Sequence, residues 1–407
     1  MVSLIPLISI GLLLVINYRV KRKIILPSSV VLILYFFSFL AAVVLEIQGQ
    51  EVPVLPVIYF TLLIVIYTLP LLYLREDKEL EVIGRSLQTV EKIFWCMTPL
   101  FTYALLYYIV NTPSLLGGDI GRERYIVATG RSDVVEEGVF RQAASFGLLF
   151  YPWLPMFALN IFRRTRKINA KMLFVCILST SVVFNSLMIY GRSGIVYWVM
   201  AWLFWIGVYW RTFNPSMRVV LLKWSSIAIL LMSVPFVVIT LSRFGTTSLN
   251  KSGSSPMQSV VSYFGQNVSN FTIAYEVQPS VGLRWGGSSS DDDVKFRQEQ
   301  YASLGGDTFT FGTFLKSFMP NVGRLGVLVL GILVNIYFLV LRRGVCLFRQ
   351  FRLPGFIIYY LYYTVIAQGV FYYSFANRFG NVYVIGTFLF ALFVGIFQAR
   401  RVGPNRC

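Results

Sequence analysis

Long apolar runs recur along almost the whole 407-residue chain and leave it very few possible folds. Each run has roughly 17–22 residues, the length of a helix that crosses a bilayer core of about 30 Å. Only helices and closed barrels satisfy their backbone hydrogen bonds inside a bilayer, and these runs lack the alternation of barrel strands. The sequence therefore predicts an all-α, polytopic membrane helix bundle.

We expect about eleven membrane-spanning helices within a single integral membrane domain, residues 1–407. The expected ranges are 2–18, 29–46, 54–74, 93–111, 143–162, 171–190, 194–210, 219–241, 322–341, 355–375 and 380–398. No Lys or Arg precedes the first range, so we expect a retained helix rather than a cleaved signal peptide. Two large outer connections remain, a first loop at 112–142 and the main outer loop at 242–321.

The basic residues fall on alternate connections of this bundle. One side carries 23 of the 36 Lys and Arg with 5 acidic residues, and the other carries 13 of each sign. Because Lys and Arg concentrate on the cytoplasmic side, we expect the N-terminus outside and the C-terminus in the cytoplasm. The basic excess indicates topology and attraction to anionic membrane lipid, and we expect no nucleic-acid partner.

Several function classes are disfavoured by what the chain lacks. It contains no histidine, the commonest metal ligand and general base, so we expect neither a metal nor a cofactor. No Asp or Glu lies deep within an expected span, which argues against ion- or proton-driven transport. The short cytoplasmic connections hold no Gly-rich phosphate motif, which argues against ATP-driven transport by this chain alone.

Three arginines are expected at the outer ends of helices, each within a short polar peptide. They are Arg192 in Gly-Arg-Ser-Gly, Arg243 in Ser-Arg-Phe-Gly and Arg378 in Asn-Arg-Phe-Gly. Since Arg binds phosphate in a bidentate manner, three converging arginines would suit one anionic group such as a lipid-linked pyrophosphate. The alternative is that each arginine only snorkels from a helix end.

The main loop adds candidates for chemistry and for sugar binding. Glu276 is a candidate general base, and Asp307, which follows two glycines, is a candidate base or sugar ligand. Arg284 is a weaker phosphate ligand, while Tyr275 and Trp285 can stack on sugars. The alternatives are a solvated linker, a solvated carboxylate at Glu276 and a plain turn at Asp307.

The first outer loop contributes Arg122 and Arg124, which alternate with an acidic residue. These two arginines would bind a phosphate or an acidic sugar, or would only pair with their neighbours.

The chain resembles the oligosaccharide repeat-unit polymerases of bacterial surface polysaccharides, the O-antigen or Wzy-type polymerases. The resemblance lies in the helix plan, the late outer loop and three short motifs. The motifs are Gly191-Arg192-Ser193-Gly194, Tyr275-Glu276 and Gly305-Gly306-Asp307-Thr308-Phe309. It implies a fold like that of lipid-donor glycosyltransferases and a place in the bacterial inner membrane.

The resemblance also implies an activity. Such enzymes transfer a glycan from undecaprenyl pyrophosphate to the non-reducing end of another lipid-linked repeat unit, without metal or nucleotide. Glu276, Asp307 and Arg192 would be catalytic, and the other candidates would bind substrate. A chain-length regulator and a flippase are candidate partners, and the product would be O-antigen, capsule or exopolysaccharide. A flippase or exporter of lipid-linked sugars is an alternative, as is an O-antigen ligase, although ligases carry an outer-face histidine.

Overall fold

The computed structural model describes ten stretches of the chain. They are residues 1–21, 26–73, 87–112, 138–188, 191, 193–245, 256–276, 313–343, 352–370 and 383–393. The regular structure in these stretches is entirely helical. Nine segments of this described part are long and apolar enough to cross a membrane. The chain is therefore a multi-pass helical membrane protein, as the apolar runs predict.

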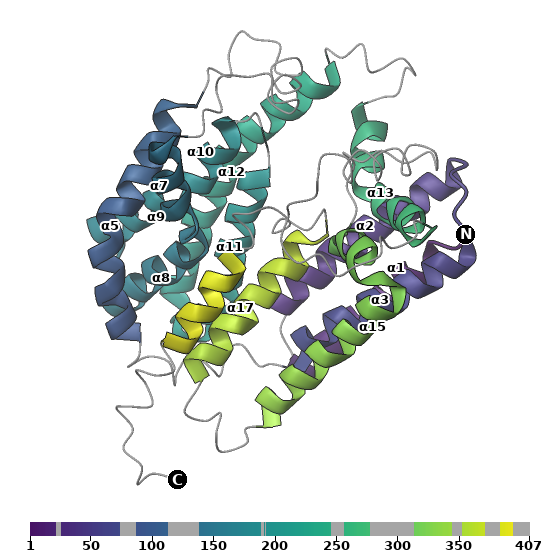
Figure 1. Ribbon diagram of the computed structural model, residues 1–407. Coiled ribbons are helices and arrows are strands. Elements are labelled where there is room, and N and C mark those ends of the chain that lie inside the picture. The colour runs from purple at the N-terminus through teal and green to yellow at the C-terminus, as the bar shows by residue number, and fades with distance from the viewer. Residues whose placement is uncertain are drawn as a thin grey trace. The chain divides into compact units, whose positions relative to one another are not determined.

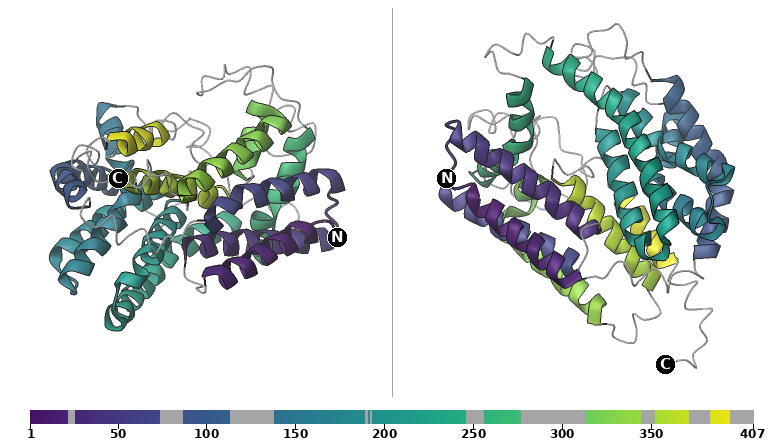
Figure 2. Two further views of the ribbon diagram at one scale, coloured as in Figure 1. Left: turned by 90° about the horizontal axis from the view of Figure 1, so that it is seen from below. Right: turned by 180° about the vertical axis from the view of Figure 1, so that it is seen from behind.

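The chain gathers into two compact units. Unit 1 comprises Met1–Ile83 together with Met257–Cys407, and unit 2 comprises Gly84–Pro256. Within unit 1, the purple N-terminal helices lie beside the green helices of the C-terminal half in each view (Figures 1 and 2). Unit 1 is thus built from the two ends of the chain, and unit 2 is inserted between them.

Unit 1 begins with three consecutive helices and is completed by four later ones. They are α1 (Leu4–Lys21), α2 (Pro27–Ile47), α3 (Val54–Tyr73), α13 (Pro256–Glu276), α15 (Phe314–Arg343), α17 (Arg352–Gln368) and a short helix at Tyr383–Phe393. Glu46 accepts hydrogen bonds from the Val2 and Ser3 amides and pairs with the N-terminal amine at 3.3 Å. These bonds satisfy free N–H groups ahead of α1, so α1 begins beside the end of α2.

Unit 2 is a bundle of shorter pieces. They are α5 (Leu87–Val110), α7 (Val139–Leu148), a 3₁₀ turn (Tyr151–Trp153), α8 (Leu154–Thr165), α9 (Ala170–Ser179), α10 (Ser181–Met188), α11 (Ser193–Tyr209), a second 3₁₀ turn (Trp210–Thr212) and α12 (Pro215–Gly245). Pro152 and Pro155 interrupt the segment from α7 to α8, because proline cannot donate a helical hydrogen bond. The Pro152 carbonyl accepts a hydrogen bond from the buried Trp205 indole at 2.8 Å.

Each of the eleven expected ranges overlaps a described helix. Two of these helices, α17 and Tyr383–Phe393, are shorter than a full span within the described residues. The number of membrane crossings therefore stays a prediction beyond the nine candidate spans.

The main loop contains a helix that the sequence did not predict. Helix α13 occupies 21 residues of the expected loop and buries Val268, Phe271 and Ala274 at helical spacing. Its polar residues obscured this stripe, yet Asn267 is itself buried and donates to the Ser38 hydroxyl of α2 at 2.8 Å. The expectation of a continuous loop is therefore corrected at α13.

Candidate functional site

An arginine and three aromatic rings lie close together at the C-terminal end of α13, beside the first turns of α3. The Arg324 guanidinium lies over the Tyr275 ring, 3.8 Å from its centroid. The Tyr59 ring centroid is 5.5 Å from that of Tyr275 and 6.5 Å from that of Phe271. We call Tyr59, Phe271, Tyr275 and Arg324 the Arg324 cluster. It joins three helices, α3, α13 and α15, that are far apart in the sequence.

A sharp turn inside α15 sets the position of Arg324. Gly323 has φ 72° and ψ 173°, which separates α15 into a short arm and a long arm. A residue with a Cβ rarely enters this region, so glycine is required here. Arg324 is the first residue after the turn, and its carbonyl accepts a hydrogen bond from the Tyr59 hydroxyl. The turn and the tyrosine together hold the arginine at the end of α13.

Arg324 stabilises the end of α13 by a direct hydrogen bond. Its Nε and Nη2 atoms both donate to the Tyr275 carbonyl, with Nε at 3.1 Å. The last carbonyls of a helix lack helical partners, and a cation there also complements the helix dipole. A guanidinium has five N–H groups, so three have no acceptor among the described residues. The exposed arginine thus combines a structural role with unused capacity for binding an anion.

The carboxylate of Glu276 directly follows Tyr275 in the sequence. Glu276 is the last residue of α13 and is exposed. Within the described part of the chain it forms no ion pair with Arg324, so the positive charge is not neutralised there. The Arg324 cluster and Glu276 therefore present a cation, aromatic faces and a carboxylate at one helix end.

The short arm of α15 leads up to this cluster and packs against α3. Phe314 begins the arm, is fully buried and packs against Tyr67 with ring centroids 5.2 Å apart. The Phe314 amide also donates to the Gly369 carbonyl at 2.9 Å. Tyr67 lies eight residues after Tyr59 on α3, about 12 Å along the helix axis. The arm therefore rises from the level of Tyr67 to that of Tyr59 before the chain turns.

The long arm of α15 then returns along α3, beside which it lies in Figure 1. The Tyr67 hydroxyl donates to the Val327 carbonyl at 2.9 Å, and Asn335 donates to the Ile66 carbonyl at 2.8 Å. Gly331 permits this approach, since an added Cβ would lie 2.9 Å from side-chain atoms of Ile66 and Tyr67. Both arms are thus fixed against α3.

Two of the sequence-predicted site residues, Tyr275 and Glu276, lie at this cluster. Arg243 belongs to the last turn of α12, although its side chain lies outside the described residues. The others also lie outside them: Arg122, Arg124, Arg192, Arg284, Trp285, Asp307 and Arg378. Convergence of the three outer arginines therefore stays a prediction.

The Gly-Arg-Ser-Gly motif has a packing role as well. An added Cβ on Gly194 would lie 2.2 Å from the Val182 carbonyl oxygen, so α11 starts in close contact with α10. The second glycine of the motif is thus required for helix packing, whatever the role of its arginine.

Sequence reasoning missed Arg324 because it lies inside an expected span. The signal was nevertheless present: Gly323-Arg324 repeats the Gly-Arg pair of Gly191-Arg192, and it too stands near the expected outer end of a helix. A search for glycine–arginine pairs at helix ends would have found it.

The chain matches no protein-family model, no curated protein and no solved structure.

Proposed function

We propose that this chain is a membrane glycosyltransferase that polymerises undecaprenyl-pyrophosphate-linked oligosaccharide repeat units at the outer face of a bacterial inner membrane. The observation that carries the proposal is the contact of the Arg324 guanidinium with the Tyr275 ring. Tyr275 directly precedes Glu276 in the sequence. Transfer of a glycan from a pyrophosphate requires a cation for the leaving group and a base for the acceptor. Aromatic faces add a surface for sugars.

The depth of the cluster supports a lipid-linked substrate. Tyr59 lies five residues after Val54, the first residue of α3, or about 8 Å along the helix axis. A polyprenyl chain would stay in the hydrocarbon core while its pyrophosphate reaches this level near the bilayer surface. A soluble substrate would gain nothing from this depth.

In the proposed reaction, a hydroxyl of one lipid-linked unit attacks the anomeric carbon of another glycan. The bond from that carbon to the pyrophosphate oxygen breaks, and its electron pair leaves with the pyrophosphate. The hydroxyl proton passes to the Glu276 carboxylate. The products are a longer lipid-linked glycan and undecaprenyl pyrophosphate, so neither metal nor nucleotide enters the balance.

Arg324 would stabilise the charge that develops on the leaving pyrophosphate. Its three remaining N–H groups are available to phosphate oxygens, and fixed donors of this kind contribute about 3–4 kcal/mol, or 10²–10³ in rate. Tyr275 would stack on the donor sugar. Arg192, Arg243, Arg378 and Asp307 keep the roles expected from the sequence, and the proposal does not depend on them.

The test uses the purified full chain with undecaprenyl-pyrophosphate-linked oligosaccharides, a chelator and no nucleotide sugar. Gel electrophoresis should reveal a ladder of longer lipid-linked glycans. Arg324→Gln and Glu276→Gln should each reduce the ladder at least about a hundredfold. Arg324→Lys should retain part of the activity, because it keeps the charge and loses the bidentate geometry.

The matched control is Arg19→Gln, which removes one exposed charge from α1 of the same unit. It should leave the ladder unchanged. A normal ladder from folded Arg324→Gln protein would remove Arg324 from the site. Movement of the lipid-linked unit across vesicles without any ladder would replace the polymerase with a flippase.

A further inference from the structure

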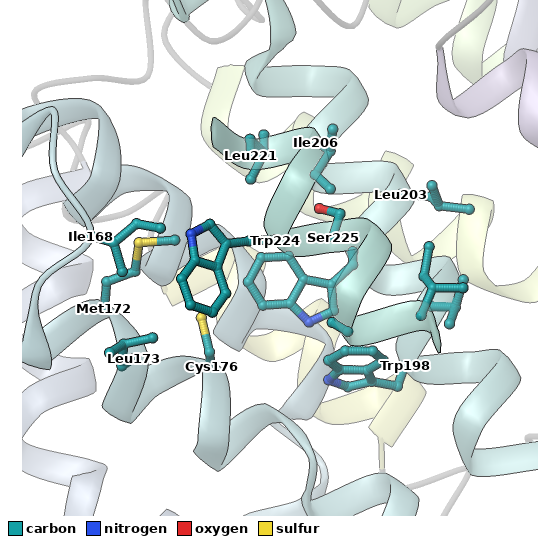
Figure 3. Close-up of a pocket in the computed structure, with 14 residues that line it drawn as sticks. Ile168, Met172, Leu173, Cys176, Trp198, Leu203, Ile206, Leu221, Trp224 and Ser225 are labelled. Carbon is teal, nitrogen blue, oxygen red and sulfur yellow. The ribbon is translucent and has the colours of Figure 1, made fainter. Parts of the chain in front are cut away.

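Unit 2 contains an apolar cavity of 160 Å³ between α9, α11 and α12. Three tryptophans, Trp198, Trp202 and Trp224, form much of its wall, and Figure 3 shows Trp224 on the same side as Met172 and Cys176. The Trp198 and Trp202 indoles donate to the Ser179 hydroxyl at 2.8 and 3.4 Å. Their polar groups are therefore occupied, and the rings offer apolar surface to the cavity.

The cavity opens on surfaces that face hydrocarbon in a bilayer. All three helices belong to candidate membrane spans. At its edges, Trp224 is 49% exposed, Ile229 47% and Leu173 44%. Dry apolar cavities of similar size bind apolar molecules rather than water. In a bilayer, the apolar molecule available to such a surface is the hydrocarbon chain of a membrane lipid.

Lysines stand beside the lining residues at one end of the cavity. Lys167 precedes Ile168, Lys171 precedes Met172 and Lys223 precedes Trp224, and each of these lysines is exposed. No Asp or Glu occurs in the sequence between Gly138 and Tyr275, so the three helices that line the cavity carry no carboxylate, and Glu91 of α5 pairs with Arg164. Long lysine side chains at this depth reach the headgroup level and attract anionic lipid.

We propose that this cavity is a binding site for one acyl chain of an anionic phospholipid, with its phosphate held by Lys167, Lys171 and Lys223. The lysines lie on the side with the basic excess, so the lipid belongs to the cytoplasmic leaflet. This places the site away from the expected outer-face chemistry. The inference is independent of the proposed polymerase activity.

The test places the full chain in lipid nanodiscs that contain phosphatidylglycerol with a photoreactive group in its acyl chain. Mass spectrometry then maps the labelled peptides. Phosphatidylglycerol should label the peptides around Met172 and Trp224 several times more strongly than phosphatidylcholine bearing the same group. Each lysine near an anionic surface contributes about fivefold in binding, so Lys171→Gln with Lys223→Gln should lower the labelling by about 25-fold.

Two matched controls separate this site from general lipid contact. Lys92→Gln removes an exposed lysine from α5 of the same unit and should leave the labelling unchanged. Ala228→Trp fills the cavity and should abolish the labelling, whereas Leu230→Trp on the exposed face of α12 should not. Equal labelling by both lipids, or full labelling of the double lysine variant, would overturn the proposal and indicate ordinary surrounding lipid.

Discussion

Replacing Gly323 with Ala tests whether the turn in α15 positions Arg324. A backbone at φ 72° and ψ 173° is nearly confined to glycine, and strain of this kind costs about 1–3 kcal/mol. The variant either keeps the turn and carries the strain, or relaxes it and moves the short arm. Relaxation would break the hydrogen bonds from Arg324 to the Tyr275 carbonyl and from the Phe314 amide to the Gly369 carbonyl.

The expected shift in melting temperature follows from that strain. Unfolding entropy is about 2.1 cal/mol/K per residue, which for 407 residues is about 0.85 kcal/mol/K. A loss of about 1–3 kcal/mol therefore lowers Tm by about 1–4 °C if the chain unfolds cooperatively. The effect on the polymerase ladder should be larger, because a displacement of 1 Å at a catalytic group can cost about a hundredfold in rate.

The assay is tryptophan fluorescence during thermal unfolding of the detergent-solubilised protein. Gly386→Ala is the matched control, since Gly386 lies in the helix Tyr383–Phe393 and an added Cβ would meet nothing within 4 Å. That variant should be neutral or more stable by up to about 1 kcal/mol, because Ala favours helix over Gly. If the Gly323→Ala variant has the Tm of the wild type and keeps full activity, the turn does not position the arginine.

Three further predictions test the packing of the two units. Gly331→Leu should destabilise unit 1 by at least about 1–3 kcal/mol through overpacking against α3, measured as a lower Tm, whereas a normal Tm would place the long arm elsewhere. Cysteines at Tyr67 and Phe314 should join through a short bifunctional thiol reagent, whose products separate on a gel, because the two rings are 5.2 Å apart. Arg164→Gln removes a partly exposed ion pair with Glu91, whose atoms are 2.9 Å apart, and should lower the free energy of unfolding by less than about 1 kcal/mol. A larger loss of stability in thermal unfolding would indicate that the pair belongs to a buried network.

The spans were predictable because bilayer thickness alone sets their length and apolar content. Helix α13 escaped prediction because it is stabilised by burial on α2 and α3 rather than by an apolar run. Asn267 reads as polar in the sequence, yet its partner is Ser38, more than two hundred residues away. The interruptions at Pro152 and Pro155 could have been read from the sequence, since proline breaks helical hydrogen bonding.

The candidate site was predictable only in part. Tyr275-Glu276 stood out as an aromatic and a carboxylate in a polar region, and the structure places Arg324 beside this pair. Arg324 fell just inside the outer end of an expected span, and its Gly-Arg pair indicates a helix end without showing that the chain turns at Gly323. Glycine is common in membrane helices, so Gly323 does not by itself predict a turn.

By itself, the sequence determined that this protein folds in a membrane, that it is helical, and how charge is distributed along its connections. Those properties follow from hydrophobicity and charge, which are sums over local residues. Tertiary structure alone decided which helices share a unit, where the short arm of α15 packs against α3, and that the Arg324 guanidinium lies over the Tyr275 ring. These contacts join residues dozens to hundreds of positions apart, and their free energy depends on packing that no local pattern encodes.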